Sequence, residues 1–154
     1  MLKRILLGLL ILLVVVQFIR PSRNQSNAAS VNDISAHYTV PDNVQAVLKK
    51  ACYDCHSNNT NYPWYTNIQP IGLWMQNHVN EGKEELNFSE FATYQLKKQA
   101  HKLEETAEML EKDEMPLGSY TLVHKEAKLT IEEKELLVSW AQSLQQQIAS
   151  QVTK

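Results

Sequence analysis

The two cysteines of this chain lie within one short stretch, "ACYDCHSNNT" (51–60), and they are its only thiols. Cys52 and Cys55 are separated by two residues, and His56 follows directly. A disulfide between them would close a very small ring, which removes little entropy from the unfolded chain. Two thiols and an imidazole concentrated in this way predict a single site that uses all three side chains.

An apolar segment near the N-terminus, residues 5–19, carries no charge and one polar side chain, Gln17. As a helix it would span roughly 22 Å, slightly less than the roughly 30 Å of a bilayer's hydrocarbon core, although flanking residues and local thinning could make up the difference. No small-x-small cleavage site follows directly. We therefore expect residues 1–20 to form an uncleaved membrane anchor, with a cleaved signal peptide as the alternative.

The chain beyond this segment is acidic. From Asn24 onward it contains 11 Lys and Arg against 17 Asp and Glu, a net charge of −6. This balance disfavours nucleic acid as a partner. The chain contains no Gly-rich phosphate loop and no serine-elbow motif, and no pattern combines a nucleophile, a base and an oxyanion site. We therefore expect a protein that is not an enzyme and has no small-molecule substrate.

Hydrophobic periodicity predicts helices along most of the chain. Residues 21–38 are polar, small and aperiodic, which is typical of a flexible linker. Regular patterning begins at residue 39, and Thr130 and Glu133 form a capping-box pattern at the start of the last helix. No segment alternates at period two, so we predict an all-α domain over residues 39–154. The apolar helical faces are expected near residues 44–51, 71–78, 96–110 and 136–144, and Gly82 is expected to end the second of these helices.

Three chemistries compete with a disulfide for the cysteine pair. A redox dithiol normally begins a helix after a strand, whereas these cysteines end a predicted helix with no strand nearby. A zinc site would need a fourth ligand, from His78, His101 or His124, and no second closely spaced ligand pair exists. Covalent haem uses each thiol on one vinyl group and the adjacent histidine on the iron. We therefore predict one haem c attached to both cysteines with His56 as the proximal iron ligand, and zinc or disulfide chemistry as the alternatives.

A low-spin haem iron takes a sixth ligand, and Met115 is the predicted one. It lies 59 residues after His56, and Pro116 disfavours helix at the residue before it, so Met115 should lie on a loop. Ligation by His and Met raises the haem potential and suits electron transfer. His78, which shares a helical face with Trp74, is the alternative sixth ligand.

The stretch that begins with the cysteine pair resembles the bacterial haem-binding domain family, a set of small exported proteins that are similar to c-type cytochromes. The attachment site continues into "YPWY" (62–65), and "NFS" (87–89) and "MPLGSY" (115–120) follow. The resemblance covers residues 38–144. It implies covalent haem on Cys52 and Cys55 with His56 as the proximal ligand, and a fold broadly similar to class I cytochromes c.

The resemblance also implies a haem pocket, for which the candidate wall residues are Tyr62, Pro63, Trp64 and Trp74. The predicted function is a membrane-tethered monohaem c-type cytochrome that transfers single electrons to an unknown redox partner. The alternative is a haem-based gas or redox sensor, or a haem-binding module of a larger complex. Because haem is attached on the outer side of the bacterial inner membrane, we expect the domain to face the periplasm, either anchored or released by signal cleavage.

Overall fold

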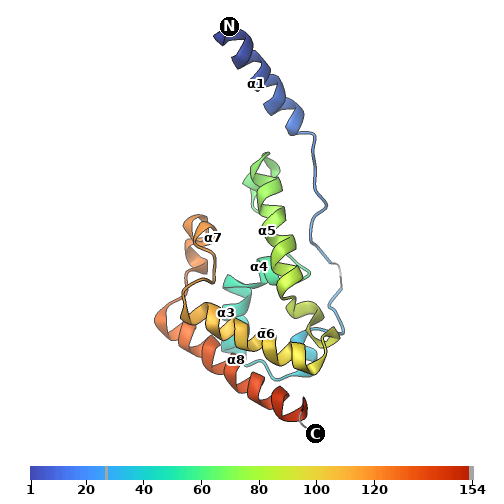
Figure 1. Ribbon diagram of the computed structural model, residues 1–154, viewed down its shortest axis with the longest axis vertical. Helices are drawn as coiled ribbons and strands as arrows, with labels where there is room; N and C mark the ends of the chain where they lie inside the picture. Colours follow the sequence, from blue (N-terminus) through green and yellow to red (C-terminus); the bar gives the residue numbers. More distant parts are fainter. Residues whose placement is uncertain (27, 153–154) are drawn as a thin grey trace.

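The computed structural model describes residues 1–26 and 28–152. Within these residues every regular element is an α-helix or a 3₁₀-helix, and the extended pairing is limited to an isolated bridge between Gln25 and Asn59. The prediction of an all-α fold is therefore confirmed. Figure 1 shows the first helix projecting from one end of the molecule and the C-terminus at the opposite end.

The core lies between two long helices, α6 (Leu96–Glu111) and α8 (Ile131–Val152), which make the most extensive helix–helix contact of the described chain. Buried side chains on α6 step by three and four because that spacing returns to one face of a helix. Burial of one such leucine contributes about 1.5–3 kcal/mol. The two facing stripes consist of Ala100, Leu103, Ala107 and Leu110 on α6, and of Leu137, Ala141, Leu144 and Ile148 on α8.

The start of α8 is fixed by its own cap and by an ion pair to α3 (Asp42–Ala51). The carboxylate of Glu133 accepts a hydrogen bond from the backbone N–H of Thr130 (2.9 Å), and the Thr130 hydroxyl accepts one from the N–H of Glu133 (3.2 Å). This is the predicted capping box. Lys50 near the end of α3 pairs with the same carboxylate. The pair positions α3, which leads into the cysteine motif, against the core.

The turn that carries the cysteines packs directly on α5 (Ile71–Glu85). This turn is the short helix α4 (Tyr53–His56), which follows α3 after Cys52. The sequence suggests that α5 ends at Gly82, but the helix continues to Glu85. A Cβ atom on Gly82 would lie 2.9 Å from both the Cβ and the carbonyl oxygen of Cys55. The glycine therefore allows a close approach of α5 to α4 and does not end the helix.

Short helices connect the longer ones. The 3₁₀-helix η1 (Trp64–Asn67) precedes α5, and η2 (Phe88–Thr93) links α5 to α6. A loop that contains Met115, as predicted, leads from α6 to α7 (Gly118–Val123), and η3 (Lys125–Ala127) follows before α8. Figure 1 shows α7 projecting from the end of the α6–α8 pair.

Residues 21–38, predicted as a flexible linker, pack against the domain over most of their described length. The backbone N–H of Thr60 donates to the carbonyl of Asn24 (2.9 Å), so this segment pairs with the loop that follows the cysteine motif. Ile34 is fully buried in the core and begins α2 (Ile34–His37). The carboxylate of Asp33 caps α2 by accepting a hydrogen bond from the backbone N–H of Ser35. One buried isoleucine and a set of backbone hydrogen bonds hold a segment whose composition alone is typical of a linker.

The prediction of an N-terminal membrane anchor is wrong. The apolar segment forms α1 (Leu2–Val16), in which no residue is buried. Across the part of the chain that the structure describes, no helix combines the length and the apolar character needed to cross a membrane. The helix ends at Val16, and Gln17 directly after it exchanges two hydrogen bonds with Gln69, donating to its carbonyl (3.0 Å) and accepting from its N–H (2.9 Å). Because no described helix is long and apolar enough to cross a membrane, the anchor predicted over residues 1–20 and the membrane-anchored periplasmic localisation that depends on it are not supported.

Candidate functional site

A cavity of about 520 Å³ lies where α3, α4, α5, α6 and α8 meet, with the loop before α7 at its edge. Its volume falls within the range of roughly 300–1,000 Å³ that is typical of cofactor and ligand pockets. The wall is mainly apolar, and its polar groups are few. The apolar wall includes Leu48, Ala51, Phe88, Leu110, Leu137 and Trp140.

Both cysteines line this cavity, and neither forms a disulfide. Burial raises the pKa of Cys52 to about 12 and the pKa of Cys55 to about 11. The thiols therefore remain protonated at neutral pH, whereas a redox dithiol depends on a thiolate. Within residues 1–26 and 28–152, no three or more His, Cys, Asp or Glu side chains are grouped as a metal site, so the zinc alternative gains no support. The cysteines offer two neutral thiols on an apolar wall.

His56 is held in one orientation by the end of α5. Its Nδ1 atom lies 2.9 Å from the carbonyl oxygen of Leu86, the residue directly after the end of α5. A carbonyl can only accept, so Nδ1 donates its proton and Nε2 keeps its lone pair. Burial lowers the pKa of His56, which favours the neutral ring. A histidine that binds a metal usually donates its other ring N–H to a carbonyl or carboxylate in this way.

Met115 lies on the loop between α6 and α7 and lines the same cavity, together with Pro116 and Leu117. Its backbone N–H donates to the carbonyl of Met109 (3.3 Å), which ties the loop to the last turn of α6. The structure thus brings Met115 together with the two cysteines and His56, as the prediction requires. Met109 also lines the cavity, although its helical spacing in the sequence indicates only a core residue.

His78, the alternative ligand, lies on α5 and also lines the cavity. Its Nδ1 atom lies 3.5 Å from the carboxylate of Glu81, and its ring packs edge-on against Trp74 at 4.6 Å between centroids. The Nε2 atom is buried and has no hydrogen-bond partner. Buried polar side-chain atoms without partners are rare in folded proteins, so His78 has a nitrogen available for a ligand.

The four predicted pocket residues Tyr62, Pro63, Trp64 and Trp74 do not line the cavity. Trp64 is 75% exposed, and the Tyr62 hydroxyl instead accepts from the N–H of Asn24 (2.8 Å) and donates to Gln76 (2.7 Å). The loop after the cysteine motif runs away from the cavity, along the N-terminal segment. The aromatic side chains on the wall come from other elements and are Phe88, Tyr120 and Trp140.

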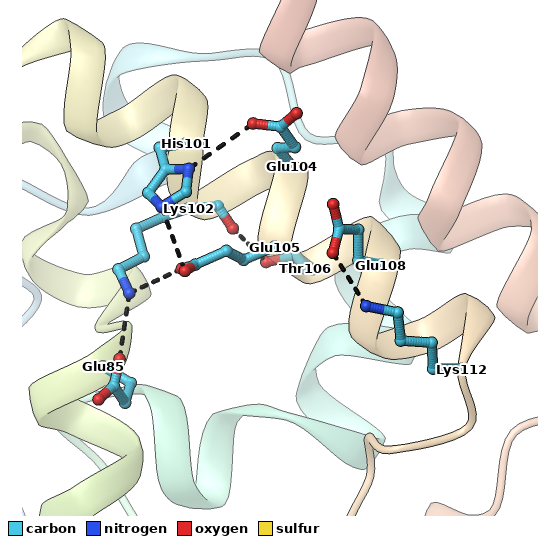
Figure 2. Close-up of polar contacts among 8 residues, drawn as sticks. All are labelled: Glu85, His101, Lys102, Glu104, Glu105, Thr106, Glu108 and Lys112. Carbon is cyan, nitrogen blue, oxygen red and sulfur yellow. Dashed lines mark hydrogen bonds and ion pairs between the residues drawn. The ribbon is translucent and has the colours of Figure 1, made fainter.

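A cluster of charges lies on the cavity wall between α5 and α6, and Figure 2 shows the contacts of Lys102 with Glu85 and Glu105 there. Lys102 on α6 lies 3.1 Å from the carboxylate of Glu85 on α5 and 2.7 Å from that of Glu105. The hydrogen bond to Glu105 is the main cause that raises the pKa of Lys102, so the side chain remains charged. Lys102 is the one cationic side chain on the cavity wall that the structure describes, and it lies among glutamates.

Asp54 and Tyr120 form a contact that the sequence does not indicate. The Tyr120 hydroxyl donates to Oδ2 of Asp54 at 2.6 Å, and Oδ1 of Asp54 accepts from the N–H of Asn61 at 2.9 Å. Burial, and then the hydrogen bond to Asp54, raise the pKa of Tyr120, so its hydroxyl remains a donor. Because 66 residues separate the two partners, no local pattern could have revealed the contact.

These features define a class of protein: a small helical domain whose apolar cavity presents two neutral thiols and an imidazole with a free nitrogen. A family profile described as haem-binding domain matches residues 11–143, which include all the residues of the cavity wall named above. The chain belongs to the haem-binding domain family, and the predicted resemblance is confirmed. No curated protein and no solved structure gives a significant match. Family membership supports haem as the cofactor of this cavity.

Proposed function

We propose that this protein binds one haem covalently through Cys52 and Cys55, with His56 as the proximal iron ligand, and that it transfers single electrons. One observation carries the proposal. The imidazole of His56 is fixed through Nδ1 by the carbonyl of Leu86, and both neutral thiols line the same cavity. Each thiol would add its S–H across one vinyl group of the haem. This addition forms a thioether and releases no leaving group.

The cavity wall suits a haem in polarity as well as in size. Bound haem supplies an iron that cycles between ferrous and ferric states. The chain contributes apolar walls that exclude water and a neutral imidazole held at a fixed angle, and these features set the reduction potential. A haem also carries two carboxylates, and Lys102 is the wall side chain suited to bind one of them. Lys102 would then exchange its contact with Glu85 or Glu105 for this carboxylate.

For the sixth position we propose Met115, with His78 as the alternative. Met115 lies on the cavity wall, and a thioether ligand favours ferrous iron and a high potential. His78 is supported by a separate observation, the buried Nε2 atom without a hydrogen-bond partner. The two ligands predict different spectra, because the weak sulfur-to-iron charge-transfer band of the oxidised protein requires a sulfur ligand.

The covalent attachment is tested by producing the full chain in cells that contain cytochrome c maturation machinery. After extraction with acidified acetone the protein should remain red, and its intact mass should include one haem. Cys52→Ser and Cys55→Ser should each retain one thioether and show altered reduced spectra, and the double variant should release all its haem. If the unmodified protein loses its haem on extraction, covalent attachment is refuted.

A second function, that of a haem-based gas or redox sensor, is favoured by the weak packing of α7. None of its residues is buried, and Leu122 and Val123 are 77% and 59% exposed. Met115 lies on the loop that leads into α7, so loose packing of α7 would allow a gas to replace Met115 at the iron. Carbon monoxide distinguishes the two functions, since rapid binding to the ferrous protein supports a sensor and slow binding supports electron transfer.

A further inference from the structure

In the part of the chain that the structure describes, the segment that carries Met115 is joined to α4, the turn that carries Cys55, by one hydrogen bond, from Tyr120 to Asp54. Met115, Leu117 and Tyr120 all line the cavity. The first turn of α7 joins the last two, since the N–H of Tyr120 donates to the carbonyl of Leu117 at 2.9 Å. The Tyr120 hydroxyl then reaches Asp54, which lies between the two cysteines on α4. Movement of Tyr120 away from α4 would therefore displace the loop before it.

Other contacts of α7 with the rest of the fold are few. Among the described elements, α7 packs mainly against η3, which follows it directly in the chain. The Tyr120 ring stacks on His124 with centroids 4.4 Å apart, and Nε2 of His124 lies 2.5 Å from the hydroxyl of Tyr65 on η1. With no buried residue on α7, hydrogen bonds rather than apolar burial hold it in place. A hydrogen bond from a hydroxyl to a carboxylate is among the stronger ones in proteins.

We infer that Tyr120 and Asp54 are positioning residues that hold the loop of Met115 over the cavity, and so control how readily an external ligand replaces Met115 at the iron. The inference rests on the proposed function. Asp54 is itself fixed, because its second oxygen accepts from the backbone of Asn61. Asp54 thus links α4 to the part of the cavity wall that Met115 and Tyr120 form.

The test uses the full-length protein with haem attached and the variant Tyr120→Phe, which keeps the ring but removes the hydroxyl. We expect carbon monoxide to bind the ferrous variant about tenfold faster or more, as loss of one hydrogen bond to a charged group implies. Haem should remain attached. Asp54→Asn, which keeps an acceptor, should restore part of the slow binding relative to Asp54→Ala. An unchanged rate in Tyr120→Phe would overturn the inference.

The matched control is Tyr38→Phe. Tyr38 also donates its hydroxyl to a side chain, Gln99, but it packs against the core and does not line the cavity. This variant should leave the rate of carbon monoxide binding unchanged. If it accelerates binding as much as Tyr120→Phe does, the effect is a general loss of stability and the inference is wrong.

A second measurement separates the inference from the proposed function. Amide hydrogen exchange of residues 118–123 can be followed in the protein without haem, where Tyr120→Phe should accelerate exchange in α7 and leave α6 unchanged. Loss of haem on extraction from the unmodified protein would refute the proposed function alone. Unchanged exchange in α7 would refute the positioning role of Tyr120, whether or not haem is attached.

Discussion

Gly82 is the residue at which the packing of α5 on α4, the turn that carries Cys55, can be tested most directly. An alanine Cβ at this position would lie 2.9 Å from Cβ of Cys55, 2.9 Å from its carbonyl oxygen and 3.3 Å from its carbonyl carbon. These atoms belong to the backbone and to the first carbon of a side chain, so no rotation can move them away. Gly82→Ala must therefore push α5 and α4 apart.

The size of the effect follows from two opposing terms. Replacing glycine by alanine within a helix stabilises it by about 0.8–1 kcal/mol where space is free. Overpacking of a well-packed contact costs about 1–3 kcal/mol, and a clash with backbone atoms belongs in the upper part of that range. We therefore expect a net loss of about 1–2 kcal/mol in the free energy of unfolding. The same displacement moves Cys55, so the yield of covalently attached haem should fall as well.

Urea unfolding of the protein without haem, followed by circular dichroism, measures the stability, and intact mass measures the yield of attachment. The control is Gly118→Ala, since a Cβ on Gly118 meets nothing within 4 Å. This variant should be as stable as the unmodified protein or slightly more stable. If Gly82→Ala proves as stable as Gly118→Ala and attaches haem normally, the close approach of α5 to Cys55 does not exist in solution.

Three further predictions concern the iron ligands, acid stability and the core. Met115→Ala should abolish the sulfur-to-iron band of the oxidised protein and lower its potential, while His78→Ala should leave both unchanged. Absence of this band from the unmodified protein, with a spectral change in His78→Ala and none in Met115→Ala, would assign the sixth position to His78. The hydrogen bond from Lys50 holds the pKa of Glu133 below its ordinary 4.5, so this carboxylate stabilises the fold above pH 4.5 and the contribution is lost as the pH falls through the lowered value. Glu133→Gln should flatten that part of the acid denaturation curve, and an unchanged curve would contradict the assignment. Leu103→Ala, at a fully buried position on α6, should cost about 2–5 kcal/mol in urea unfolding, and a loss below about 1 kcal/mol would show that α6 is not packed as described.

Periodicity in the sequence was sufficient to predict α3, α5, α6 and α8 and the start of α8, because local spacing and capping decide both. The apolar steps of α6 and the pair formed by Thr130 and Glu133 are local patterns, and the structure contains both. Gly82 shows the limit of such reasoning. A glycine after an apolar face is typical of a helix end, but contact with Cys55, which lies 27 positions earlier, explains this one.

The candidate site also combines residues that local sequence patterns predict with residues that they do not predict. The cysteine pair and His56 lie within five consecutive residues, so a local motif groups them without knowledge of the fold, and the loop at Met115 follows from one proline. The aromatic wall could not be predicted, because Phe88 and Trp140 reach the cavity from elements far apart in the chain, while the aromatics nearest the motif follow a loop that runs elsewhere. The contact of Asp54 with Tyr120 is equally non-local.

The contacts of residues 17–34 with the domain determine how freely α1 can move relative to the haem cavity. A flexible tether of this length would let its ends wander over a distance of about 20–25 Å. Here the chain is fixed at Gln17 by Gln69, at Asn24 by Thr60 and at Ile34 by the core. These three contacts restrict rotation of the domain relative to α1. The cavity therefore keeps one orientation relative to the end of α1.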